Sequence, residues 1–473
     1  MSLFRTKAIE TDLGKNTGLK RSLNAFDLTM LGVGAIIGAG IFVLTGVTAA
    51  THSGPAIVLS FVLAGVACAC AALSYAEMAA SVGGAGSAYG YGYATLGELP
   101  AWVICWMLIC EYTVAVAAVS VGWSGYLNNG LQALGFGLPD FLLHGPFDTK
   151  APGLINLPAA LIILVLGVLL ASGAKVSAQL NAIIVAIKLA AVALFIGVAL
   201  FHLQPALWSP FIPPAEIDAA TGVGRFGWQG IVDGASTIFF AYLGFDAVST
   251  AAEETRNPQR DLPIGILGSL TLCTVLYILV SGLLTGIVPY RSLNVDSPVS
   301  FALLQIGQNW AAGLISIGAV AGLTTVMLVM FFGQTRVLMA VSRDGLLPRF
   351  LSTVNPATGS PTRSIMISGA AMLLLGGFVP LNKLAELANI GTLGAFVVVC
   401  VGVIVLRNKQ PNLKRPFKVP LYPLVPALGV LLCGYLMVTL AQFTWIAFGI
   451  WLVIGLFIYF GYSRSNSLLA TAT

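Results

Sequence analysis

The stretch GVGAIIGAGIF at residues 32–42 decides how the rest of this sequence is interpreted. It lies within an apolar run, 26–50, that is long enough to cross a bilayer, since a helix needs about 20 apolar residues to span the hydrocarbon core. Small residues four apart would also let such a helix pack closely against its neighbours. Gly38 and Gly40, however, stand two apart, and each glycine disfavours a helix by roughly 1 kcal/mol relative to alanine. The stretch therefore predicts a membrane helix that is broken near its middle.

The composition indicates a polytopic membrane protein. Hydrophobic residues make up 58% of the 473 residues and charged residues only 9%, which lies outside the range of soluble domains. Backbone groups inside a bilayer have no water to bind, so long apolar segments form helices. Twelve predicted transmembrane helices fill the chain, at residues 26–50, 56–81, 97–127, 155–172, 180–202, 229–251, 262–288, 300–332, 364–380, 386–406, 421–440 and 443–462.

The charge distribution predicts the orientation of these helices. Lys and Arg are retained on the cytoplasmic side of a membrane, and an even helix count puts both chain ends on one side. Placing the ends in the cytoplasm leaves four of the 23 Lys and Arg residues outside, namely Lys150, Arg225, Arg291 and Lys383. The net charge of +5 is then a topology signal for a multi-pass protein of the cell (plasma) membrane, and no nucleic-acid partner is expected.

A second interrupted helix is predicted in the sixth span. The segment FFAYLGFDAVSTAAEE (239–254) contains Gly244 and the acidic Asp246 where an apolar stretch is needed. Breaks in the first and sixth helices indicate an inverted repeat of helices 1–5 and 6–10, in which the two breaks meet near the bilayer midplane. Free amides of one half-helix can bind a carboxylate, and free carbonyls of another can bind an ammonium. Two such breaks therefore predict an amino-acid transporter.

Three segments carry a resemblance to a known family: GVGAIIGAGIFVLTG (32–46), GFDAVSTAAEETRNPQRDLPIGI (244–266) and GQTRVLMAVSRDGLLP (333–348). They resemble the amino acid-polyamine-organocation superfamily, specifically the cationic amino acid transporter branch and its bacterial members. The resemblance implies an all-α, five-plus-five inverted-repeat (LeuT-like) fold with two peripheral helices, alternating access and proton-coupled uptake of L-amino acids. The implied segments are a cytoplasmic N-terminal segment (1–25), the first repeat (26–202), the second repeat (229–406), helices 11 and 12 (421–462) and a cytoplasmic tail (463–473).

The resemblance also assigns contacts with the substrate. The head group is expected at Ile36, Gly38, Ala39 and Gly40 of helix 1 and at Phe240, Ala241 and Leu243 of helix 6. Family members often carry Thr or Ser where Ala39 stands, so one carboxylate hydrogen bond is in doubt here. Met330 on helix 8 aligns with a position that is small in animal members, and its bulky thioether would shorten the pocket. Neutral amino acids of small or medium apolar size are therefore favoured over arginine and lysine.

Lys188 is the expected site of proton coupling. It lies in the middle of helix 5, and an ionisable residue at that depth is a functional candidate. Burial without a counterion favours the neutral amine, so this side chain can take up and release a proton. A lysine that reaches an aqueous vestibule or pairs with Glu111 is the structural alternative. Sodium is the alternative coupling ion, with a candidate site on helix 8 that a charged Lys188 would exclude: Ala321, Thr324 and Thr325.

Two further carboxylates have open roles. Glu111 of helix 3 lines the substrate side-chain pocket, neutralises a lysine or accepts backbone hydrogen bonds, and the sequence does not separate these possibilities. Asp246 is expected to hold the broken segment of helix 6 in place. Both are charged residues in membrane segments and so are functional candidates.

Other classes of protein fit less well. The three histidines, His52, His144 and His202, lie at span ends or in loops, and no HExxH or GxSxG motif occurs, so an enzyme is not expected. The seven cysteines lie within apolar spans without metal-ligand spacing, so neither a metal nor another cofactor is expected. A sodium-coupled symporter, an exchanger, an amino-acid-sensing transceptor and a channel are the remaining alternatives, and a small single-helix membrane partner is compatible with the sequence.

Overall fold

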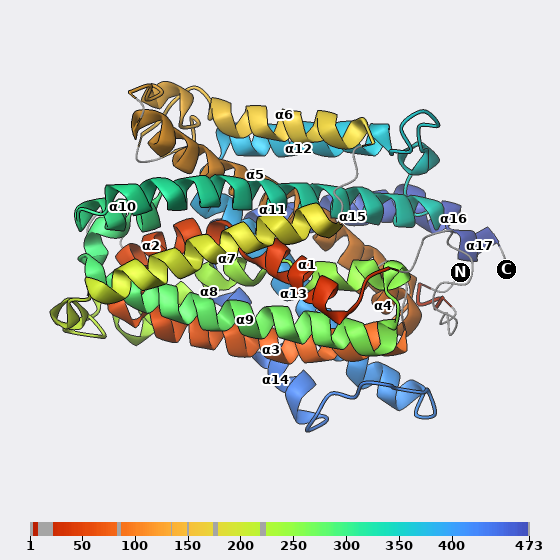
Figure 1. Cartoon of the computed structure of the whole chain (residues 1–473). Coiled ribbons are helices and arrows are strands. Elements are labelled where there is room, and N and C mark those ends of the chain that lie inside the picture. The colour runs from red at the N-terminus through yellow and green to blue at the C-terminus, as the bar shows by residue number, and fades with distance from the viewer. Residues whose placement is uncertain are drawn as a thin grey trace.

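The computed structural model is almost entirely helical. It describes residues 3–7, 22–82, 87–133, 135–148, 151–173, 178–217 and 224–471. Figure 1 shows the long helices running roughly parallel, with α6 (Leu157–Ala171) and α12 (Thr362–Phe378) side by side along one edge and α14 (Leu424–Val438) at the opposite edge.

The first half of the chain contains two long central helices, α3 and α5, and one interrupted helix. Its elements in order are α1 (Ala25–Ile36), a π-helical turn (Gly40–Leu44), α2 (Thr45–Thr48), a second π-helical turn (Ala49–Ser53), a 3-10 turn (Gly54–Ala56), α3 (Ile57–Ser81), α4 (Ser87–Thr95), α5 (Glu98–Ala133), a 3-10 turn (Asp140–Leu142), α6, α7 (Ala178–Phe201) and a 3-10 turn (Pro205–Trp208).

The second half begins with a two-stranded antiparallel ribbon, in which Glu216 pairs with Arg225. Its elements in order are β1 (Glu216–Ile217), β2 (Gly224–Arg225), α8 (Gly227–Ile238), two 3-10 segments (Phe239–Tyr242 and Asp246–Glu254), α9 (Pro258–Ile287), a 3-10 turn (Tyr290–Leu293), α10 (Pro298–Gln305), α11 (Asn309–Arg343), a 3-10 turn (Arg349–Ser352), α12, α13 (Leu381–Lys409), α14, α15 (Gln442–Ile458), a π-helical turn (Tyr459–Ser463), α16 (Arg464–Asn466) and α17 (Leu468–Thr471). The core forms where α5 packs on α11 and α13, and where α9 packs on α1 and α3.

Eight helical segments of the described chain are long and apolar enough to cross a membrane. They are Gly40–Ser81, Glu98–Gln132, Ala182–Phe201, Gly227–Ala252, Pro258–Ile287, Asn309–Arg343, Leu381–Lys409 and Gln442–Asn466. Four shorter apolar helices, α1, α6, α12 and α14, fall within other predicted spans. A polytopic helical membrane protein is thus confirmed, whereas the count of twelve spans and the inverted repeat stay predictions.

The predicted span 300–332 is wrong in its bounds. Gly307 adopts a left-handed φ of 77°, which separates α10 from α11. The second helix then continues to Arg343, well beyond the predicted end. Polar residues beyond position 332 have partners inside the bundle: the amide of Gln334, for example, donates to the hydroxyl of Thr113 over 2.7 Å. Hydropathy identifies the apolar part of a helix. It misses a polar continuation whose side chains form hydrogen bonds with other helices of the protein.

The two described chain ends lie at the same end of the molecule (Figure 1). The buried carboxylate of Glu98 accepts hydrogen bonds from Arg5 at 3.3 Å, from the Tyr459 hydroxyl at 3.0 Å and from the Ser467 hydroxyl at 2.5 Å. This arrangement agrees with an even number of membrane crossings. We call this end of the molecule the terminal side.

All seven cysteines are unpaired and buried. Within the described residues no cluster of His, Cys, Asp or Glu has the composition of a metal site.

Candidate substrate site at two broken helices

The first helix breaks within the stretch that the sequence singled out. Helix α1 ends at Ile36, and Ile37 is extended with φ −70° and ψ 97°. Helical structure resumes only with the π-helical turn at Gly40. The Ile37 amide still donates to the Val33 carbonyl at 3.0 Å, and the Gly38 carbonyl accepts from the Phe42 amide at 3.4 Å. The helical hydrogen bonding is therefore interrupted over a short stretch, which suits a backbone-lined binding site.

The sixth helix breaks at Gly244. Helix α8 ends at Ile238 and continues as a short 3-10 segment, after which Leu243 is extended with ψ 140°. Gly244 has φ 110°, a conformation that side chains rarely adopt. The chain then resumes as a 3-10 helix at Asp246. A single glycine with left-handed backbone thus turns the chain out of one half-helix and into the next.

The two breaks are in direct contact, and glycine makes the contact feasible. A Cβ atom added to Gly40 would lie 2.3 Å from the Cα atom of Ala241. A Cβ atom added to Gly244 would lie 2.9 Å from the Cβ atom of Ala35. Neither position has room for a side chain without a backbone shift. The glycines therefore act as spacers that let one unwound backbone touch the other.

Tyr277 of α9 links the two breaks, and no sequence pattern predicted it. Its hydroxyl lies 2.8 Å from the carbonyl oxygen of Ile36 and 2.8 Å from that of Ala241. The side chain is fully buried. A hydroxyl has one proton to donate, so the two carbonyls share it. A tyrosine within an apolar span resembles an ordinary core residue, and only the folded backbone shows what it holds.

Replacing Tyr277 by phenylalanine should weaken substrate binding by roughly two- to tenfold, because one buried hydrogen bond contributes about 0.5–1.5 kcal/mol net. Both carbonyls would lose their shared donor, and the breaks would be held less firmly. Substrate affinity of the purified protein, measured by thermal shift or calorimetry, tests this. Tyr435→Phe, on the exposed face of α14, is the matched control and should bind normally. Equal affinities for both variants would contradict a role for Tyr277 in the site.

The residues assigned to the head group all lie at the breaks and are buried: Ile36, Gly38, Ala39, Gly40, Phe240, Ala241 and Leu243. Met330 is 2% exposed on the neighbouring helix α11. Gly38 faces the same helix, since a Cβ atom there would lie 3.3 Å from Val326. The structure thus brings these residues into one region, while their contact with a substrate stays a prediction.

Lys188 of α7 reaches the same region and is fully buried. Its ammonium donates hydrogen bonds to the carbonyl oxygens of Gly34 at 2.7 Å and Ile37 at 3.1 Å. Its aliphatic stem packs on α11, where a Cβ atom at Gly322 would lie 2.9 Å from the lysine Cγ. The lysine therefore binds the backbone on either side of the point where α1 ends, and it does not pair with Glu111.

The two threonine hydroxyls of the alternative sodium site have different partners. The Thr325 hydroxyl donates to the carbonyl of Gly322 at 2.8 Å. The Thr324 hydroxyl instead accepts a hydrogen bond from Trp123 of α5 at 3.0 Å. Ala321 is half-buried. In this arrangement both hydroxyls are already engaged, and the Lys188 ammonium occupies the helix 1 carbonyls.

Glu111 and Asp246, whose roles the sequence does not decide, lie close enough to interact electrostatically. Both oxygens of Glu111 are buried and have no hydrogen-bond partner among the described residues. Asp246 accepts a hydrogen bond from the hydroxyl of Tyr112 at 3.2 Å. Glu111 therefore neither neutralises a lysine nor accepts a backbone hydrogen bond in this structure.

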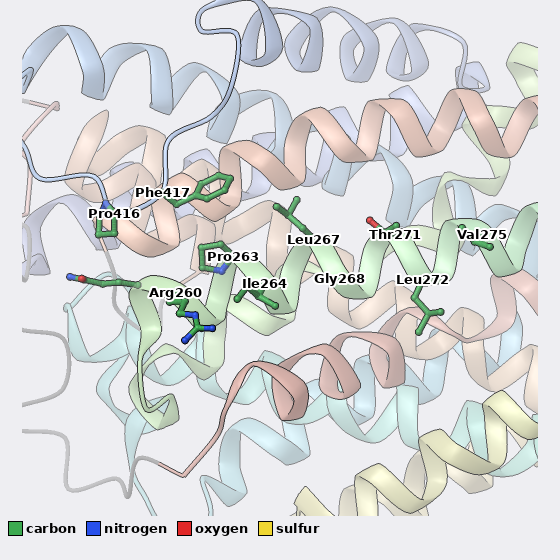
Figure 2. Close-up of a pocket in the computed structure, with 11 residues that line it drawn as sticks. Arg260, Pro263, Ile264, Leu267, Gly268, Thr271, Leu272, Val275, Pro416 and Phe417 are labelled. Atoms are coloured by element: carbon green, nitrogen blue, oxygen red, sulfur yellow. The ribbon is translucent and has the colours of Figure 1, made fainter.

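A groove of about 1000 Å³ lies elsewhere, along the partly exposed helix α9. Figure 2 shows Pro416 and Phe417 beside the end of this helix that carries Arg260. These two residues belong to the loop before α14, which the carboxylate of Glu77 anchors by accepting a hydrogen bond from the Val419 amide at 2.7 Å. No lining residue of the groove belongs to either break, so we do not assign the substrate to it.

Comparison with known proteins now decides the family. The sequence profile described as amino acid permease matches residues 23–460. The chain belongs to the amino acid permease family. This confirms the resemblance to the amino acid-polyamine-organocation superfamily, and this permease is a transporter and not an enzyme.

The permease has close relatives of full length. It is 51% identical to the branched-chain amino acid permease BcaP of Bacillus subtilis (strain 168), over 99% of each chain. It is 47% identical to the methylthioribose transporter of the same organism, again over 99% of each chain. Cationic amino acid transporter 4, vacuolar, of Arabidopsis thaliana is 39% identical over 87% of this chain and 68% of that protein.

Proposed function

We propose that this permease takes up neutral L-amino acids of small or medium apolar size together with protons, by alternating access across the cell membrane. The observation that carries the proposal is the hydrogen bonding of the buried Lys188 ammonium to Gly34 and Ile37 at the helix 1 break. A charged ammonium holds these carbonyls, whereas a neutral amine binds them less strongly. Protonation of Lys188 is thereby linked to the shape of the backbone that binds substrate.

Recognition of the head group needs no charged side chain. The amides around Gly38 and Gly40 are proposed to bind the carboxylate, and carbonyls at Phe240 and Leu243 the ammonium, because unwound half-helices leave backbone groups without their full helical partners. The Phe240 carbonyl accepts a hydrogen bond from the Leu243 amide at 3.2 Å and keeps a second lone pair for the ammonium. Ala39 lacks the hydroxyl that many family members provide, so the carboxylate relies on backbone amides alone. The name of the relative identified as a branched-chain amino acid permease supports an apolar side-chain pocket.

Met330→Ser should extend the accepted substrates to arginine or lysine. The buried thioether of α11 fills the space proposed for a longer side chain, and serine would leave room and add a hydroxyl. Competition by a panel of amino acids against labelled leucine measures the change. Met366→Ser is the control, since Met366 is 67% exposed on α12 and should leave the range unaltered. An unchanged range in the Met330 variant would mean that this pocket is placed wrongly.

Reconstitution into liposomes tests the function as a whole. Counterflow should exchange valine, leucine and alanine, and an imposed pH gradient without sodium should drive their accumulation. Methylthioribose belongs in the same panel, because one relative carries that name and this molecule lacks the amino-acid head group. Its transport in place of amino acids would overturn head-group recognition.

The remaining outcomes separate the alternatives. Strict sodium dependence would favour the site at Ala321, Thr324 and Thr325 over Lys188. Exchange without accumulation under either gradient would identify an exchanger. Binding without any counterflow would identify a transceptor.

A further inference from the structure

A buried pair of acidic side chains next to the helix 6 break has no part in the proposed function. Glu111 of α5 and Asp246 are each 1% exposed and lie close enough to interact electrostatically. Among the described residues neither forms an ion pair with a Lys or Arg. Two ionised carboxylates side by side in such a site repel each other strongly, because water and counterions are both excluded.

Hydrogen-bond donors lie around Asp246, although its Oδ1 atom has no hydrogen-bond partner among the described residues. The Tyr112 hydroxyl donates to its Oδ2 atom at 3.2 Å. The backbone amides of Gly244 and Ala247 also lie close to this carboxyl. Donors of this kind favour the ionised form of a carboxyl group.

The environment of Glu111 is the opposite. Neither of its oxygens has a hydrogen-bond partner among the described residues. The nearby hydroxyl of Thr392 donates instead to the carbonyl of Ala388 at 3.1 Å. A carboxylate without donors is costly to bury, whereas the neutral acid is far less so. Charge repulsion and missing donors therefore both favour a proton on Glu111.

Tyr75 of α3 interacts with the same two carboxyls. Its hydroxyl is fully buried, has no hydrogen-bond partner in the part of the chain that the structure describes, and interacts electrostatically with both Glu111 and Asp246. Its ring is fixed by edge-on packing against Phe245 at 5.7 Å and Phe396 at 5.4 Å. An unpartnered buried hydroxyl is rare in native proteins. The Tyr75 hydroxyl can therefore donate a hydrogen bond to a carboxylate of the pair when the charge on that pair changes.

We propose that Glu111 and Asp246 form a proton site separate from Lys188, in which Glu111 holds the proton and Asp246 is ionised. Asp246 begins the 3-10 helix that leads to the terminal side, where Leu23 and Thr255 form a bridge between the segments flanking the two broken helices. Glu111 belongs to the long, continuous helix α5. When the terminal-side halves of helices 1 and 6 move away from α5, water enters, the O–H bond of Glu111 breaks and its proton passes to that water. Closure restores the protonated pair.

Infrared spectroscopy tests the protonation directly. At neutral pH the purified permease should show the C=O stretching band of a buried, protonated carboxylic acid, and Glu111→Gln should lose it. Asp246→Asn should keep the band at a shifted frequency. Glu254→Gln is the control, because Glu254 is ion-paired with Arg336 at 3.0 Å, and should leave the band unchanged. A band that survives in Glu111→Gln, or that disappears in Asp246→Asn, overturns the assignment.

Counterflow tests the link to movement. With equal pH on both sides, the wild type should slow as the pH rises, because a deprotonated Glu111 beside Asp246 resists closure. Glu111→Gln, which stays neutral, should slow less than the wild type as the pH rises, and any dependence that remains in this variant belongs to Lys188. An unaltered pH profile would rule out the link. Both experiments leave Lys188 in place and need no proton gradient. They therefore remain decisive even if the coupling role of Lys188 fails.

Discussion

Proton-driven uptake should be lost when Lys188 is replaced by alanine. The ammonium that holds the carbonyls of Gly34 and Ile37 would be absent, and no other described Lys or Arg donates to them. Substrate accumulation under an imposed pH gradient should fall at least about tenfold, since charge-assisted hydrogen bonds contribute roughly 1.5–3 kcal/mol each. Radiolabelled uptake into proteoliposomes measures the loss.

The control for this experiment is Lys383→Ala. Lys383 packs over the ring of Phe443, 5.5 Å from its centroid, outside the two breaks, and its removal should leave uptake intact. Gel filtration of both variants shows whether they fold. A Lys188→Ala protein that still accumulates substrate in response to a pH gradient would disprove the coupling role, and sodium dependence of that uptake would point to helix 8.

Gly40→Ala should abolish substrate binding or weaken it more than about tenfold. The added methyl group would lie 2.3 Å from both Cα and Cβ of Ala241, so the second break would have to shift. Overpacking of this kind costs about 1–3 kcal/mol even where flexible side chains can adjust, and here the obstacle is backbone. Ligand-induced thermal stabilisation and counterflow should both decline.

Two glycines provide matched controls for that substitution. Gly434 of α14 and Gly449 of α15 have nothing within 4 Å of an added Cβ atom. Alanine at either position should be neutral or slightly stabilising, because it lowers the flexibility of the unfolded chain. If Gly40→Ala binds substrate as tightly as these controls, the contact between the breaks is not part of the site.

The sequence predicted the features that depend on local composition. Apolar runs marked the helices, paired glycines marked the break in helix 1, and Gly244 beside Asp246 marked the break in helix 6. These predictions succeed because the residue type alone sets the helix propensity and the free energy of transfer from water to the bilayer. Lys188 was also recognisable, since a charge deep in an apolar span requires a reason.

Other features depend on what the chain meets after folding. The helix α4 (Ser87–Thr95) was missed because its alternating tyrosines and glycines are not apolar enough to mark a span. Tyr277 and Tyr75 look alike in sequence, yet one hydroxyl joins two broken helices and the other has no partner. Such differences arise from the positions of distant carbonyls and carboxylates, which no local pattern encodes.

The burial of every cysteine has a practical consequence for following the transport cycle. Membrane-impermeant thiol reagents need a solvent-exposed sulfur, and the native chain offers none in this state. A single cysteine introduced at exposed Thr353 or at exposed Ser292 would therefore be labelled against a silent background. The wild-type permease can thus serve as its own starting scaffold for site-directed fluorescent or spin-label reporters, with no need to remove native thiols first.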